Sequence, residues 1–115
     1  MAVVLAATLA VCGALAAPRP DERTPLLKSI DSLLQVARYD TARALTIASI
    51  RAAETRGDSA GVGALAFRFG RVSVTLGHQA IALRELDRAI RLTGAARDTV
   101  NLAQALLFRG FVHRD

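Results

Sequence analysis

The chain has 115 residues, close to the length of one domain, and 52% of them are apolar while 22% are charged, which excludes a disordered chain. Aromatic residues make up only 4%, tryptophan is absent, and alanine and leucine dominate, so closely packed helices are favoured over a sheet. The net charge of +5 comes from arginines scattered among acids, without a zinc-finger spacing or an aromatic RNA-binding motif, which argues against a nucleic-acid-binding domain.

The first predicted element is an apolar segment at residues 1–17, which carries no charged side chain and ends in small residues. It is similar to an export signal cleaved after Ala16, and the alternative is a membrane anchor at the short limit for crossing a bilayer. Acylation of Cys12, the only cysteine, is a further alternative, although Val11 suits a lipoprotein signal poorly. We therefore expect export to the periplasm or the extracellular space, or anchoring if the segment is not cut, with membrane contact only through these residues.

The remaining chain predicts a linker and five helices. Residues 18–25 contain three prolines and should be extended, with Thr24-Pro25 supplying the first helix start. Apolar residues then recur at helical spacing over five segments, about 26–37, 41–56, 59–76, 79–93 and 99–113. Between them we expect N-caps at Asp40, Asp58 and Asp98 and left-handed turn residues at Gly57 and Gly77. No segment alternates as a strand does, so the predicted fold class is all-α.

An internal repeat relates these helices. A shift of forty residues aligns Ala42 with Ala82, Ile50 with Ile90, Arg51 with Arg91, Asp58 with Asp98, Gly70 with Gly110 and Val72 with Val112. The matches fall at equivalent places in the helices, so the repeated unit is a pair of helices that occurs about two and a half times.

The second repeat carries a family resemblance. Phe69-Gly70, Leu76-Gly77 and the series Ala82, Leu86, Ala89 resemble the tetratricopeptide repeat family, in its long variety of about forty residues. The resemblance covers roughly residues 26–113. It implies that residues 26–115 form antiparallel helix pairs stacked as a short right-handed α-solenoid. In that arrangement Gly70 would let the neighbouring helix approach closely, and Gly77 would let the chain reverse.

Two helices have unusual apolar patterns. The helix at 59–76 has two apolar stripes, which predicts contacts with its own partner and with an adjacent repeat. The last helix is apolar over more of its circumference: Val100, Leu102, Ala103, Leu106, Leu107, Phe108, Phe111 and Val112. We expect its open side to be covered by chain beyond residue 115, which would make the domain truncated at its C-terminus, or by a partner, including a second copy.

Catalytic chemistry is not indicated by any motif. His78 and His113 lack metal-ligand spacing, Ser73 lacks the setting of a nucleophile elbow, and the glycine-rich stretch 57–63 lacks the ending of a phosphate loop. The sequence therefore predicts no enzyme, no cofactor and no metal.

The resemblance also implies a binding groove, because first helices of successive repeats line a concave face in this family. The corresponding residues are Ala64, Phe67, Arg68, Arg71, Val74, Thr75, Gln104, Leu107, Phe108 and Phe111. In this groove Arg68 and Arg71 could grip a carboxylate and Phe67 could meet an apolar side chain. The alternative is that these are exposed arginines beside a packed aromatic ring.

Two functions follow as hypotheses. The first is a noncatalytic scaffold for protein–protein or peptide interaction, exported or membrane-anchored. The alternative is the N-terminal sensor or assembly region of a larger bacterial signalling protein or enzyme, whose catalytic domain would lie beyond residue 115.

Overall fold

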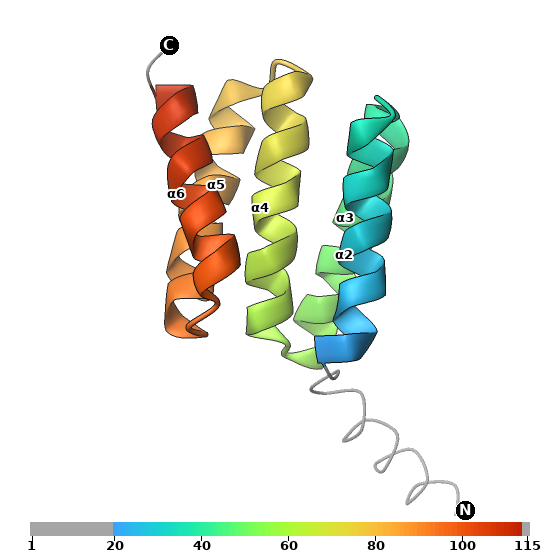
Figure 1. Cartoon of the computed structure of the whole chain (residues 1–115), viewed down its shortest axis with the longest axis vertical. Coiled ribbons are helices and arrows are strands. Elements are labelled where there is room, and N and C mark those ends of the chain that lie inside the picture. The colour runs from blue at the N-terminus through green and yellow to red at the C-terminus, as the bar shows by residue number, and fades with distance from the viewer. Residues whose placement is uncertain (1–19, 114–115) are drawn as a thin grey trace, which may run out of the picture.

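The computed structural model describes residues 20–113, and within that range the chain forms five helices and no strand (Figure 1). The helices are α2 (Pro20–Gln35), α3 (Tyr39–Arg56), α4 (Ser59–Thr75), α5 (Gln79–Ala95) and α6 (Thr99–His113). The all-α prediction is confirmed, and the segment 1–17 lies outside the described residues.

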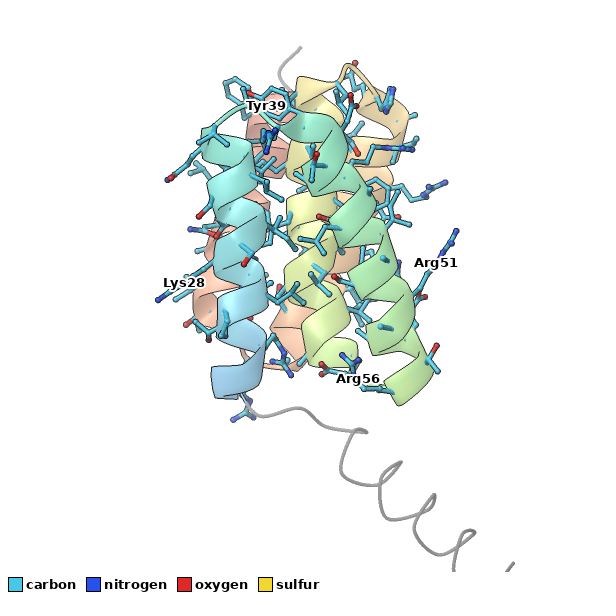
Figure 2. All side chains as sticks on the ribbon, turned by 90° about the vertical axis from the view of Figure 1, so that its right-hand side faces the viewer. Lys28, Tyr39, Arg51 and Arg56 are labelled. Carbon is cyan, nitrogen blue, oxygen red and sulfur yellow. The ribbon has the colours of Figure 1, made fainter. Side chains whose placement is uncertain are left out.

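The helices lie in two layers. Figure 1 shows α2, α4 and α6 next to one another in one layer, with α3 and α5 behind them. Figure 2, turned by 90°, shows α2 and α3 as neighbours at one end of the molecule. Helix α4 packs against each of the other four helices, and both α2 and α6 contact it within the front layer. It is therefore the centre of the structure.

The backbone repeats every twenty residues. Helices α3 to α6 begin at Tyr39, Ser59, Gln79 and Thr99. Each is preceded by a turn with one left-handed residue, in order Ala37, Gly57, Gly77 and Arg97. In each turn the next amide donates to a carbonyl five residues earlier: Arg38 to Leu33, Asp58 to Ala53, His78 to Ser73 and Asp98 to Thr93. The four turns thus share one geometry, which satisfies the carbonyls that a helix end leaves unpaired.

Two of the three predicted N-caps are confirmed. An Asp58 oxygen accepts from the Gly61 amide at 3.1 Å, and an Asp98 oxygen accepts from the Asn101 amide at 3.3 Å. The prediction for Asp40 is wrong, because α3 begins at Tyr39 and Arg38 occupies the N-cap without a side-chain bond. Asp40 lies instead in the first turn, where a negative charge complements the helix dipole.

The predicted start of the first helix is also wrong. Helix α2 begins at Pro20 and contains Pro25, so residues 20–25 are helical rather than part of an extended linker. Pro25 is the sixth residue of α2, where a proline removes one backbone bond and crowds the carbonyl four residues earlier. Arg23 ties this end of α2 to Asp58 at 2.9 Å. None of the helices within residues 20–113 combines the length and hydropathy needed to cross a membrane.

Helix α4 joins two apolar clusters, as its two stripes predicted. Val62, Leu65 and Val72 face α2 and α3, whereas Ala66 and Phe67 face α5 and α6. The close approach expected at Gly70 is confirmed, because a Cβ there would lie 2.7 Å from Leu86 Cγ. Leu86 is fully buried, so this contact is part of the core that positions α4 against α5.

Candidate functional site

The front layer contains a hollow of about 300 Å³ where α2, α4 and α6 come together. Its lining comprises Arg23, Thr24, Leu27, Ala60, Ala64, Ala96, Asp98 and Asn101. Two of these, Ala60 and Ala64, lie one turn apart on α4, and their small side chains leave the space open. The hollow therefore combines alanine and leucine side chains with polar groups contributed by α2 and α6.

The buried Arg68 borders this hollow through its hydrogen bonds and connects all three front helices. Its Nε and Nη2 atoms donate to the two carboxylate oxygens of Asp31 on α2, at 3.1 and 3.2 Å. Its Nη1 atom donates to the Ala64 carbonyl at 2.9 Å and to Asn101 Oδ1 on α6 at 2.8 Å. A guanidinium that is only 7% exposed thus has a bidentate carboxylate partner and two further acceptors.

Asn101 continues this network to the start of α6. The side-chain Nδ2 of Asn101 donates to Asp98 Oδ2 at 2.7 Å, while its Oδ1 accepts from Arg68 Nη1. A chain of polar contacts therefore runs from Asp31 through Arg68 and Asn101 to Asp98. Asp31, Arg68 and Asn101 are more than thirty residues apart from one to the next, so helical periodicity did not indicate that they would meet.

Two residues expected to line the groove are in fact packed inside the domain. Phe67 is 4% exposed, and Arg68 is occupied by Asp31, so neither is free to receive a ligand. The alternative of an exposed Arg68 is equally wrong. Sequence spacing placed both residues on α4 correctly, but their burial depends on Asp31 and on α6, which helical periodicity does not reveal. Of the predicted set, Ala64 does line the hollow.

The structure brings three predicted aromatic residues together. The rings of Phe67 and Phe108 meet edge to face with centroids 6.0 Å apart, and those of Phe108 and Phe111 are 6.3 Å apart. Phe67 is buried, Phe108 is half-buried and Phe111 is 61% exposed. The row leads from the α4 core to the surface of α6, and it stabilises the contact between these two helices.

The remaining predicted residues differ in their exposure and surroundings. Arg71 is half-buried and makes no ion pair within the described part of the chain, and Thr75 and Gln104 are exposed. Val74 lines a separate hollow of about 140 Å³ with Gly77, Gln79 and Val112. Leu107 is exposed on α6. Of the ten predicted residues, Ala64 is the one that lines the hollow between α2, α4 and α6.

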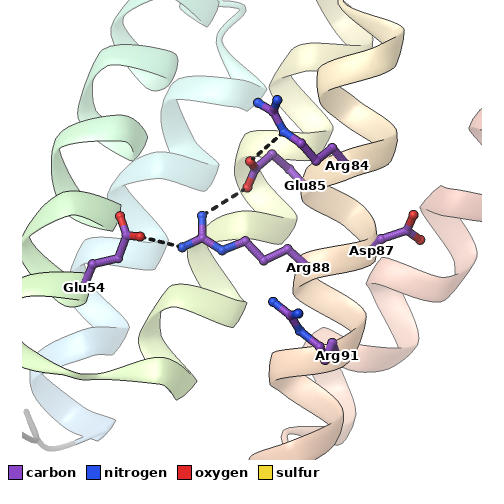
Figure 3. A pocket seen from close by; sticks show the side chains of 6 residues that line it. All are labelled: Glu54, Arg84, Glu85, Asp87, Arg88 and Arg91. Carbon is purple, nitrogen blue, oxygen red and sulfur yellow. Dashed lines mark hydrogen bonds and ion pairs between the residues drawn. The ribbon is translucent and has the colours of Figure 1, made fainter.

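A third hollow, of about 590 Å³, lies in the back layer and is rich in charge (Figure 3). Its lining residues are Glu54, Arg84, Glu85, Asp87, Arg88 and Arg91. Arg88 connects the two helices of this layer. Its guanidinium lies 2.7 Å from Glu54 of α3 and 3.6 Å from Glu85 of its own helix. Arg84 lies 3.6 Å from the buried Glu85, and Asp87 is paired with Arg109 of α6. These ion pairs connect α5 to α3 and α6.

Residues 20–113 contain no group of histidine, cysteine or acidic side chains able to hold a metal ion. No protein-family model, curated protein or solved structure matches the chain. The helix layers and their hollows therefore provide the grounds for proposing a function.

Proposed function

We propose that the chain is a noncatalytic helical scaffold, similar in build to a short right-handed tetratricopeptide solenoid, that binds a segment of a partner protein. The support is the twenty-residue recurrence of helix starts and turns, together with the contacts of α2 and α6 with α4. In a stacked helix-pair repeat, such contacts join equivalent helices of successive units. Export or anchoring through residues 1–17 belongs to the same proposal.

The observation that carries the proposed binding site is the hollow between α2, α4 and α6. Leu27, Ala60 and Ala64 offer it a small apolar surface, and its polar side holds Asp98 and Asn101, which are fixed by their hydrogen bonds to one another. A concave site with an apolar floor and a few fixed polar groups is the usual form of a recognition site.

The chemistry of the site restricts its ligand. Arg23 and Arg68 are already paired with Asp58 and Asp31, so neither is available to an incoming carboxylate. We therefore propose that the hollow receives a small uncharged side chain of a peptide rather than its C-terminus. Arg71 is the remaining arginine of the predicted groove that could contact an acidic residue farther along such a peptide.

A phage-displayed library of linear peptides, selected on the 115-residue chain, tests this proposal. Ala60→Arg places a long side chain in the hollow, whereas Ala52→Arg makes the same change at an exposed alanine of α3 in the other layer. Selected peptides should bind the first variant at least about tenfold more weakly and the second as they bind the parent.

Circular dichroism of both variants verifies that the helices remain. Failure to enrich any peptide would contradict the proposal. So would peptides that bind Ala60→Arg as tightly as the parent chain, because their site would then lie elsewhere.

A further inference from the structure

Helix α6 carries an exposed apolar surface that the proposed peptide site does not use. Leu106, Leu107 and Phe111 are 52%, 75% and 61% exposed, and together with Gly110 they line a hollow of about 260 Å³. The other side of the same helix, with Ala105 and Val112, is buried in the domain. A contiguous apolar surface on a soluble domain marks a contact with another molecule. We name the four residues 106, 107, 110 and 111 the α6 patch.

Helix α4 shows how such a surface is filled. The forty-residue repeat places Gly110 where α4 has Gly70, and Leu107 where α4 has Phe67. At Gly70 the missing side chain leaves room for a leucine of α5, whose Cγ lies 2.7 Å from the position a Cβ would take. At Gly110 nothing lies within 4 Å of that position. Gly110 therefore leaves open space on the surface of α6, where an apolar side chain of another helix can approach as Leu86 approaches Gly70; we call this space the glycine seat.

We propose that a second copy of this chain fills the seat, through antiparallel pairing of the two α6 helices about a twofold axis. Leu107 precedes Gly110 by about one turn, so one register can place Leu107 of each copy in the glycine seat of the other. In an antiparallel pair the two edges of the patch meet their own counterparts, so Leu106 of one copy lies beside Leu106 of the other, and Phe111 beside Phe111. The α6 patch is therefore self-complementary, which is the requirement of an isologous dimer contact.

The charges on α6 suit this pairing. Arg109 is the only Lys, Arg, Asp or Glu within the helix, and it is paired with Asp87 of α5 in the same molecule. Joining two such faces does not bury an unpaired charge. Antiparallel alignment also places opposite ends of the two helix dipoles together.

The size of the contact sets the expected affinity. A helix of 15 residues is about 22 Å long, so one helix pair buries less than the area of a standard stable interface. The dimer should therefore be weak, with a Kd on the order of 10–100 µM. Because each copy carries a net charge of +5, added salt should tighten it by screening the repulsion.

Sedimentation velocity of the 115-residue chain, from about 1 to about 500 µM and with reductant to keep Cys12 from cross-linking, tests the pairing. The parent should pass from monomer to dimer over this range. Leu107→Glu should weaken the dimer at least about tenfold, whereas Val36→Glu, at an exposed valine after α2, should leave its Kd unchanged.

A mixture of two variants tests the register. Leu107→Glu and Gly110→Lys should each fail to form a dimer alone, yet form one when mixed. In the mixed dimer one contact keeps the native Leu107 and Gly110, and the other joins the new glutamate to the new lysine. A chain that stays monomeric at the highest concentration would overturn the proposal. Association that ignores both α6 variants, or that continues past the dimer, would also overturn it.

Discussion

Helices α4 and α6 occupy equivalent places in the repeat, but they differ in what covers them. On α4 the face containing Gly63, Ala66, Phe67 and Gly70 is covered by neighbouring helices, and all four residues are buried. On α6 the equivalent residues are Ala103, Leu106, Leu107 and Gly110, and all four are exposed. The pattern that builds a core in one helix leaves an open apolar surface in the other.

The comparison shows that neither glycine has a fixed role. Gly70 is required by the leucine that packs on it, whereas within one chain Gly110 meets no neighbour and lowers the helix propensity of α6. The role comes from the neighbouring helix and not from the residue. Changes made at matched positions of α4 and α6 should therefore have different effects on stability.

Truncating Leu86, the leucine that packs on Gly70, should have the largest effect. Leu86→Ala removes a fully buried side chain from the α4–α5 contact and should lower the free energy of unfolding by about 3 kcal/mol. Leu107→Ala, at a side chain that is 75% exposed, should change it by less than about 0.5 kcal/mol. Urea unfolding at low micromolar concentration, where the chain is monomeric, measures both. Equal losses would mean that α6 is covered within the monomer.

The same contrast explains which features were predictable from the sequence. Helical spacing, the Asp58 and Asp98 caps and the glycines at 57 and 77 are local signals, and the structure confirms each of them. The helix start at Pro20 was missed because the prolines of 18–25 indicated an extended segment, whereas residues 20–25 are helical and Arg23 pairs with Asp58, thirty-five positions away. The helix propensity of neighbouring residues does not reveal a pair between such distant positions.

The candidate site was less predictable than the fold. Periodicity places a residue on a face of a helix, but it does not say whether another helix lies over that face. Arg68 was expected to serve a ligand, whereas Asp31 and Asn101 take up its donors. Leu107 and Phe111, which were expected in the same groove, are exposed on α6. Long-range packing decided each of these outcomes.

Exchanging each glycine for alanine should change stability in opposite directions. At Gly70 the new methyl would lie 2.7 Å from Leu86 Cγ, and because that leucine is fully buried it has little room to move. The gain in helix propensity should not offset this overpacking, so the free energy of unfolding should fall by about 1–2 kcal/mol.

Gly110→Ala meets no neighbour and should gain up to about 1 kcal/mol from the same helix propensity. Thermal unfolding followed by circular dichroism at low micromolar concentration reports the two signs. Stabilisation of both variants would show that the α4–α5 contact is looser than described, and destabilisation of both would show that Gly110 is covered.

The turns before the two helices provide the smallest expected effect. The turn before α4 has Gly57 in the left-handed region at φ 71°, and the equivalent turn before α6 has Arg97 there at φ 56°. A residue with a Cβ is strained in this region, so Arg97→Gly should stabilise the chain by about 0.5–1 kcal/mol. Gly57→Ala should destabilise it by a similar amount, because no atom lies within 4 Å of the added methyl and only the backbone strain changes. Urea unfolding measures both variants, and a loss of stability in Arg97→Gly would mean that the arginine side chain contributes more to the start of α6 than its backbone strain costs.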